Sequence, residues 1–207
     1  MSISTDWHQG FLPCQVIYKC FPHISHKCWL LDVTLDPKTA HPRLILSEDG
    51  KQVRLGYTYQ DLPDNPKRFN SSLCVLGKEG FSSGRFYYEV QVKEKTRWVL
   101  GVARESVNRK GWIIESPGNG FWTVRLWDGV YQALTDPRIT LPLREKPQKV
   151  GVFVDYEEGQ VSFFNVEARC HIYSFTGQTF NKEKLYPYFY TDYDSDPLVI
   201  CPVDVTD

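Results

Sequence analysis

Apolar and polar residues alternate in short segments along most of this chain. No segment of helical length carries an apolar stripe at 3.6-residue spacing, whereas period-two alternation, which sends successive side chains to opposite faces of a strand, recurs. In segment 86–92 the apolar face would consist of Phe86, Tyr88, Val90 and Val92. We expect strands at residues 43–46, 52–55, 86–92, 98–102, 120–127, 149–156, 160–165, 172–175 and 198–201.

Turn residues separate these segments. Asp49-Gly50 lies between two apolar runs and predicts a type I′ hairpin turn, in which both central residues have positive φ. Glu157-Glu158-Gly159 predicts a tight acidic turn. Prolines 117, 137, 142, 147, 187 and 197 fall between the expected strands, where a missing N–H does little harm. Short strands with frequent turns and no helices predict an all-β fold, an antiparallel β-sandwich of two sheets.

Charge and hydropathy narrow the classes of partner. Lysine and arginine number 24 against 25 acidic residues, which gives a net charge of -1. A nearly neutral chain lacks the basic footprint of a nucleic-acid binder and the polybasic block of a membrane-surface binder. No signal peptide and no apolar run of about 18 residues is present, so we expect no membrane insertion.

The cysteines predict a reducing, cytoplasmic environment. They lie at positions 14, 20, 28, 74, 170 and 201, with no C-x-x-C pair. Zinc is an alternative for one cluster, whose ligand types suit that metal but whose four members are crowded into nine residues. We therefore expect no metal and no cofactor, and the candidate zinc ligands are Cys20, His23, His26 and Cys28.

The sequence predicts a short N-terminal extension followed by one domain. Residues 1–29 contain no clean strand and are interpreted as an N-terminal extension. From position 30 to position 207 we find no linker, repeat or low-complexity stretch, which predicts one domain.

Several motifs in this domain, taken in order, resemble those of the PRY-SPRY family. Residues 35–40 and 44–49 are similar to the PRY motif, and Tyr88-Glu89-Val90 is similar to the W-E-V segment, with Tyr for Trp. The later motifs are Leu100-Gly101-Val102, Arg109-Lys110-Gly111, Gly120-Phe121-Trp122-Thr123, Val154-Asp155-Tyr156-Glu157, Tyr186-Pro187-Tyr188-Phe189 and 198–202. Several ordered motifs over one domain are more specific than any single one.

The resemblance implies a curved sandwich of two antiparallel sheets, a concanavalin-like jelly roll, with PRY at about 30–80 and SPRY at about 81–203. Such domains usually form the C-terminal part of tripartite-motif (TRIM) ubiquitin ligases, butyrophilins and some fish immune receptors. Variable loops at one end bind protein partners. The resemblance implies a non-enzymatic domain that chooses the substrate or ligand, because ligase activity in TRIM proteins belongs to a RING domain. The full-length parent would be oligomeric through another region.

Two alternative functions are a serine hydrolase and a phosphoantigen sensor. Gly80-Phe81-Ser82-Ser83-Gly84 fits the G-x-S-x-G nucleophile elbow of serine hydrolases, but a strand is expected to follow it and the only later histidine is His171. A butyrophilin-like phosphoantigen sensor would need converging basic residues. Arg104, Arg109, Lys110 and Arg125 are available, but Glu105 and the acidic 192–196 segment oppose an anion.

The candidate binding site centres on segment 121–127. Trp122, Val124 and Leu126 form a core face, which would leave Phe121, Thr123, Arg125 and Trp127 pointing outward. Trp and Arg are enriched at binding hot spots, although Arg125 stacking on Trp127 merely to cover the sheet would explain the same pattern. With the neighbouring loops, the predicted partner-binding residues are Arg104, Glu105, Trp112, Arg125, Trp127, Tyr131, Tyr190, Asp192 and Tyr193.

Overall fold

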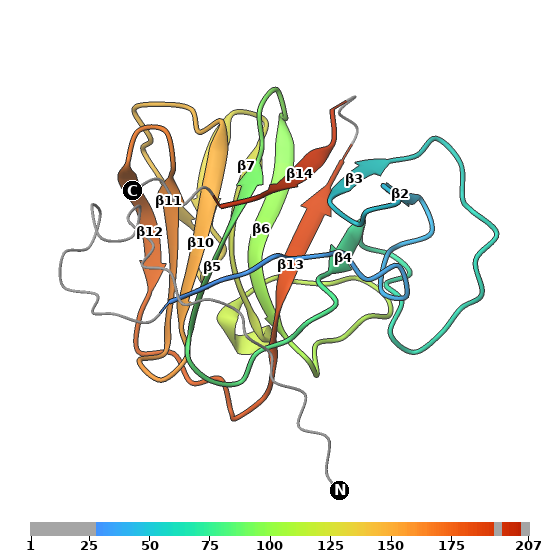
Figure 1. Cartoon of the computed structure of the whole chain (residues 1–207), viewed down its shortest axis with the longest axis horizontal. Coiled ribbons are helices and arrows are strands. Elements are labelled where there is room, and N and C mark those ends of the chain that lie inside the picture. The colour runs from blue at the N-terminus through green and yellow to red at the C-terminus, as the bar shows by residue number, and fades with distance from the viewer. Residues whose placement is uncertain (1–27, 193–195, 204–207) are drawn as a thin grey trace, which may run out of the picture.

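The computed structural model describes residues 28–192 and 196–203, which fold into two packed β-sheets (Figure 1). The first sheet has the spatial order β12-β11-β10-β5-β14-β3-β2, and β1 pairs with β5 beside this path. Its strands are β1 (Trp29–Leu30), β2 (Leu44–Leu46), β3 (Gln52–Leu55), β5 (Arg85–Gln91), β10 (Lys149–Asp155), β11 (Gln160–Asn165), β12 (Cys170–Phe175) and β14 (Leu198–Cys201).

The second sheet has the order β4-β13-β6-β7-β8-β9. Its strands are β4 (Cys74–Leu76), β6 (Arg97–Arg104), β7 (Phe121–Trp127), β8 (Val130–Ala133), β9 (Ile139–Thr140) and β13 (Leu185–Thr191). The described residues contain no α-helix, only a short 3-10 helix at Pro117–Asn119, so the predicted all-β sandwich is confirmed. The one departure is β1, which pairs in parallel with β5 and begins inside the segment assigned to the N-terminal extension.

Alternating side chains of both sheets fill the space between them. Phe86, Tyr88, Val90 and Val92 belong to this core, as predicted, together with Trp122, Val124 and Leu126 from β7. The buried Tyr88 hydroxyl donates a 2.6 Å hydrogen bond to the carbonyl oxygen of Gly101 and so joins the sheets. Gly101 has a φ of 150°, and a Cβ there would lie 2.1 Å from the carbonyl oxygen of Trp122. Only glycine fits this position.

A second apolar cluster covers part of the outer face of the second sheet. Phe69, from the loop before β4, packs there with Tyr188, which also contacts Phe121 edge to face. Phe121 and Thr123 do lie on the outer face of β7, as predicted, but both are buried there and are not exposed. The cover comes from a loop distant in sequence, which the alternation within β7 does not reveal.

Arg68 anchors that loop, which extends beyond the edge of the sandwich between β3 and β4 (Figure 1). Its buried guanidinium donates hydrogen bonds to the carbonyl oxygens of Pro37 (2.9 Å), Ala40 (2.7 Å) and Pro63 (3.2 Å). A charged side chain that satisfies three backbone acceptors holds the loop at a fixed position on the domain.

Pro187 lies inside β13, not between strands as we expected. Its carbonyl oxygen accepts a 2.9 Å hydrogen bond from the amide of Gly77, just beyond the end of β4. In an antiparallel strand the nitrogen and oxygen of one residue point to the same side. The missing N–H lies on this same side, at the first position beyond the end of β4, so Pro187 accepts the bond from Gly77 but cannot donate one in return.

The predicted hairpin turns differ in type. Only Gly50 of the Asp49-Gly50 pair has a positive φ (69°), so the turn between β2 and β3 is not type I′. Asp128 and Gly129, which join β7 directly to β8, both have positive φ, 49° and 83°. This two-residue connection is a type I′ hairpin turn. The acidic turn between β10 and β11 is confirmed.

Candidate functional site

Four strands of the second sheet bring the central candidate residues together. Arg125 of β7 pairs with Val99 of β6 and with Gln132 of β8, and Val99 pairs with Tyr190 of β13. Their side chains therefore share the outer face of the sheet, because directly paired residues point the same way. The rings of Trp127 and Tyr190 lie 6.1 Å apart.

Arg97 occupies the centre of this group, although the sequence did not predict it as a binding residue. It pairs across β6 and β7 with Trp127, and its guanidinium carbon lies 4.8 Å from the centre of the indole ring. The same guanidinium donates to both carboxylate oxygens of Asp128, at 2.7 and 3.0 Å, and lies 3.4 Å from Asp192. We expected this strand to begin at Trp98. Extending the alternation back by one residue would have placed Arg97 on the same face as Val99.

Arg125 lies beside Trp127 in a different environment. Its Nε and Nη2 atoms donate to one oxygen of Gln132, at 2.9 and 2.7 Å, and its guanidinium carbon is 5.4 Å from the Trp127 ring. Burial lowers the pKa of Arg125, and the nearby Arg138 lowers it further. Two arginines thus lie against one indole, in positions fixed by different partners.

Tyr190 and Asp192 complete this group. Asp192 is buried beside Arg97, and the pKa of Tyr190 is raised by burial and then by the charge of Asp192, so its hydroxyl remains protonated at neutral pH. Tyr193 lies outside the described residues. We call this surface the Arg125–Trp127 face; it consists of Arg97, Arg125, Trp127, Asp128, Val130, Gln132, Tyr190 and Asp192.

Three other predicted residues lie elsewhere. Arg104 ends β6 on the side that faces the core, where it packs over Trp122 (5.1 Å) and donates to the carbonyl oxygen of Thr179. Glu105 accepts a hydrogen bond from Tyr186 beyond the same end of β6. Tyr131 points toward the interior and packs near Trp98 at 6.2 Å. The structure does not bring these residues onto the Arg125–Trp127 face.

Trp112 marks a separate exposed patch. Its side chain is 85% exposed and Ile114 is 59% exposed, next to a groove of about 380 Å³ that also contacts Phe121. Phe121 is six residues from Trp127 along β7, which is about 20 Å at 3.3 Å per residue. Trp112 therefore lies toward the opposite end of the sheet from the Arg125–Trp127 face.

The geometry does not support the serine hydrolase alternative. Ser82 lies in an exposed bend that leads into strand β5, so the strand-turn-helix geometry of a nucleophile elbow is not formed. His171 instead bonds Ser174 on β12, at 2.7 Å.

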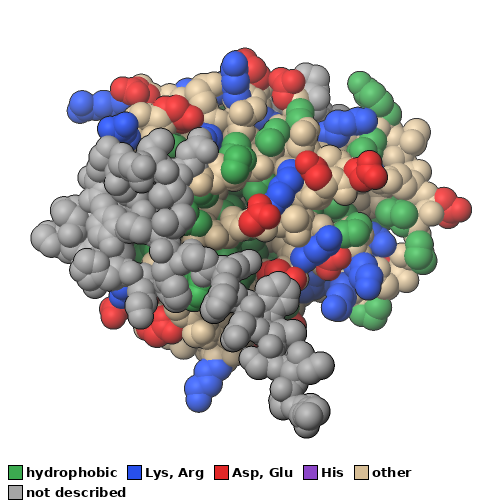
Figure 2. Space-filling view, in the orientation of Figure 1, with side chains coloured by type: hydrophobic (Ala, Val, Ile, Leu, Met, Phe, Trp, Pro, Cys, Tyr) green, Lys and Arg blue, Asp and Glu red, His purple; other side chains and the backbone are tan. Residues whose placement is uncertain are grey.

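The basic residues proposed for an anion sensor do not converge. Lys110 is paired with Asp64 at 2.5 Å, and Arg109 packs over Phe69 in the loop cluster. Arg104 faces the core, whereas Arg125 lies on the outer face. On the view in Figure 2, basic and acidic side chains are interspersed.

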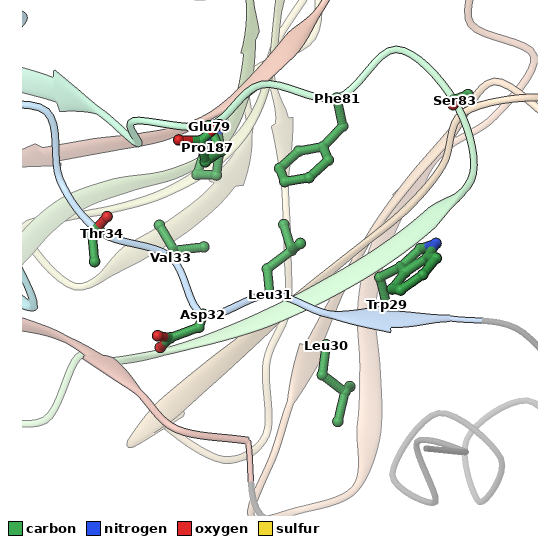
Figure 3. Close-up of a pocket in the computed structure, with 10 residues that line it drawn as sticks. All are labelled: Trp29, Leu30, Leu31, Asp32, Val33, Thr34, Glu79, Phe81, Ser83 and Pro187. Carbon is green, nitrogen blue, oxygen red and sulfur yellow. The ribbon is translucent and has the colours of Figure 1, made fainter. Parts of the chain in front are cut away.

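A groove of about 560 Å³ opens between residues 29–34 and 79–83 (Figure 3). Leu31, Val33 and Phe81 give it an apolar lining, while the carboxylate of Asp32 is paired with Lys51 at 2.6 Å. Ser83 also lines it, but no histidine does. The described residues that line the groove therefore contain no serine–histidine pair.

The metal candidates remain untested. Cys20, His23 and His26 lie outside the described residues, and the thiol of Cys28 donates to the carbonyl oxygen of Trp29. Within residues 28–192 and 196–203, no three potential ligands are grouped for a metal ion. The same ranges hold no helix long and apolar enough to cross a membrane.

Comparison with known proteins decides the family. The SPRY domain model matches residues 85–197, and the model of the SPRY-associated domain, PRY, matches residues 33–81. The chain belongs to the PRY-SPRY family. PRY-SPRY domains are binding modules. Within the PRY part, residues 36–39 are joined to β4, because the amide of Asp36 donates to the carbonyl oxygen of Leu76 and the Thr39 hydroxyl accepts from the amide of the same residue.

Related PRY-SPRY chains occur in larger proteins. The chain is 51% identical over 182 residues to human zinc finger protein RFP, covering 86% of this chain and 35% of that protein. It is 49% identical over 171 residues to human butyrophilin subfamily 2 member A2, covering 83% and 32%. It is also 49% identical over 174 residues to bovine butyrophilin subfamily 1 member A1, covering 84% and 33%. The chain thus spans about a third of the length of these relatives.

Solved structures share the fold. The TRIM65 PSpry domain superimposes with a TM-score of 0.72 at 22% identity, covering 83% of this chain and 90% of that one. The stonustoxin structure gives 0.72 at 24% identity, covering 84% and 29%.

Proposed function

We propose that this PRY-SPRY domain recognises protein partners through the Arg125–Trp127 face. In its parent protein it would select the substrate of a TRIM-type ubiquitin ligase, or the ligand of a related innate immune protein, in the cytoplasm. The domain would supply recognition only, and the parent's other regions would supply oligomerisation and any ligase activity. The relatives, which include zinc finger protein RFP and butyrophilins, support this proposal.

The observation that carries the proposal is the clustering of Trp127, Tyr190 and two arginines on one partly exposed sheet face. Trp, Tyr and Arg dominate hot spots because they combine large contact areas with directional hydrogen bonds. Here the strand pairing, the Asp128 ion pair and Gln132 already fix these side chains. Little conformational entropy would be lost on binding, which favours affinity.

The phosphoantigen alternative receives less support. A phosphate pocket needs several basic groups around one cavity. The four candidate basic residues face different directions, and three of them are engaged by Asp64 or by backbone carbonyls.

The proposal can be tested by quantitative affinity capture from cell extract, comparing wild type with an Arg125→Ala/Trp127→Ala double variant. A matched control is Arg54→Ala, because Arg54 is an exposed arginine on β3 of the other sheet. We expect a defined set of proteins to be lost from the double variant and retained by the control. Undiminished capture of every protein by the folded double variant would contradict the proposed site.

A further inference from the structure

The two arginines beside Trp127 differ in how their charge is compensated. Arg97 is bound by the carboxylates of Asp128 and Asp192. Arg125 is half-buried, and its hydrogen bonds go to the neutral amide oxygen of Gln132. No carboxylate in the described ranges lies within 4.0 Å of Arg125. The face therefore contains one neutralised guanidinium and one without a counter-ion.

The surroundings of Arg125 make its positive charge energetically unfavourable. Burial removes water from the guanidinium, and Arg138 adds a second positive charge nearby. Among the described residues Glu115 offsets them electrostatically, and its carboxylate also accepts a 3.1 Å hydrogen bond from the hydroxyl of Tyr188. A partly dehydrated cation flanked by another gains from an anion that arrives with its own hydrogen-bond acceptors.

Gln132 also orients the unused part of the group. Because Nε and Nη2 both donate to one oxygen of Gln132, the Nη1 edge of the guanidinium has no bonded partner among the described residues. Such a fixed edge suits the two oxygens of a carboxylate.

Apolar surface lies directly beside this cation. Val130 is 45% exposed and pairs across the type I′ turn with Trp127, which is itself only partly buried. We propose that the protein partner of this face places a carboxylate, from an aspartate, a glutamate or a chain terminus, against Arg125 and an apolar side chain on Trp127 and Val130. This inference rests on the proposed function.

The proposal can be tested by NMR titration of the domain with two capped dipeptides, acetyl-Leu-Glu-amide and acetyl-Leu-Gln-amide. The readouts are the Nε–Hε signal of Arg125 and the indole N–H signal of Trp127. We expect saturable shifts with the glutamate peptide and at least roughly tenfold weaker binding of the glutamine peptide, as for the loss of a charged hydrogen-bond pair. Inorganic phosphate is titrated in parallel.

Matched variants separate charge from geometry. Arg125→Gln should abolish the difference between the peptides, Arg125→Lys should retain part of it, and Arg54→Gln should leave it unchanged. Equal binding of both peptides, or the absence of a saturable shift, overturns the carboxylate inference. Phosphate binding tighter than the glutamate peptide overturns it in favour of a phosphate site. If the peptides fail but protein capture still depends on Arg125 and Trp127, only this inference falls; if capture is also unaffected, the proposed function falls too.

Discussion

The guanidinium of Arg97 lies over the ring of Trp127, 4.8 Å from its centre, and is held there by the carboxylate of Asp128. Asp128 in turn is fixed by the positive φ of the type I′ turn that connects β7 to β8. Backbone geometry, ion pair and aromatic contact thus form one unit. The ion pair with Asp128, together with Asp192, thus holds Arg97 against the indole.

We expect the ion pair between Arg97 and Asp128 to be lost at low pH. The hydrogen bond from Arg97 holds the pKa of Asp128 below its ordinary value of 3.8. Because the pKa is lower in the folded protein, the contribution of the ion pair is fully present above about pH 4 and is lost as the pH falls through the folded-state value. Carbon-13 titration of the Asp128 carboxyl would report its midpoint.

The Arg97→Gln variant is the control for this titration. Without the guanidinium, the midpoint of Asp128 should rise toward 3.8. A midpoint that does not change would show that another group lowers the pKa.

Loss of the hydrogen bond between the sheets should cost measurable stability. Tyr88→Phe keeps the ring and removes the hydroxyl that bonds the carbonyl oxygen of Gly101. We expect a loss of about 1–2 kcal/mol in the free energy of unfolding, as for a buried hydrogen bond without water to replace it. Urea denaturation measures this, and wild-type stability in the variant would argue against the bond's importance.

Two glycines with positive φ should respond differently to alanine. In Gly101→Ala the new Cβ would collide with the backbone of β7, so we expect a loss of more than about 4 kcal/mol or failure to fold. At Gly111 no atom lies within 4 Å of a Cβ, so only the cost of the left-handed conformation remains, about 1–2 kcal/mol. Similar losses in both variants would contradict the crowding seen at Gly101.

Arg68→Met should loosen the loop before β4. The variant keeps much of the side-chain volume but leaves three carbonyl oxygens without their donor, which should cost about 3 kcal/mol. Lys67→Met is the matched control, because Lys67 is exposed and its change should stay within about 0.5 kcal/mol. Thermal unfolding and limited proteolysis of residues 56–66 would compare the two; equal susceptibility would show that the anchor lies elsewhere.

Most strands were predictable from sequence, including the short β2, β3 and β14, whereas the seven-residue β13 was not. The alternation in 86–92 identified both β5 and its core face. Three of the missed strands, β4, β8 and β9, have only two to four residues, so they show little alternation. Pro187 was expected between strands, yet it lies in β13. A proline is tolerated at this position because β4 ends at Leu76, and the end of a neighbouring strand cannot be seen in the sequence of β13.

The candidate site was predictable in part for the same reason. Alternation correctly placed Arg125 and Trp127 on one face of β7. The same alternation would have placed Arg104 on the opposite face of the sheet from Arg125, because Arg104 lies an even number of residues after the buried Trp98 on β6. The burial of Phe121 in the cluster that contains Phe69, and the contact of Tyr190 with Trp127, depend on segments that are distant in sequence, which no local pattern encodes.

The two-residue connection between β7 and β8 limits how this surface can diversify. One inserted residue would shift the register of β8 and send Val130 and Gln132 to the opposite side of the sheet. Evolution and protein engineering should therefore alter ligand preference here by exchanging side chains at fixed chain length. Length variation belongs instead in the long segment between β3 and β4, whose tip can grow without moving a strand.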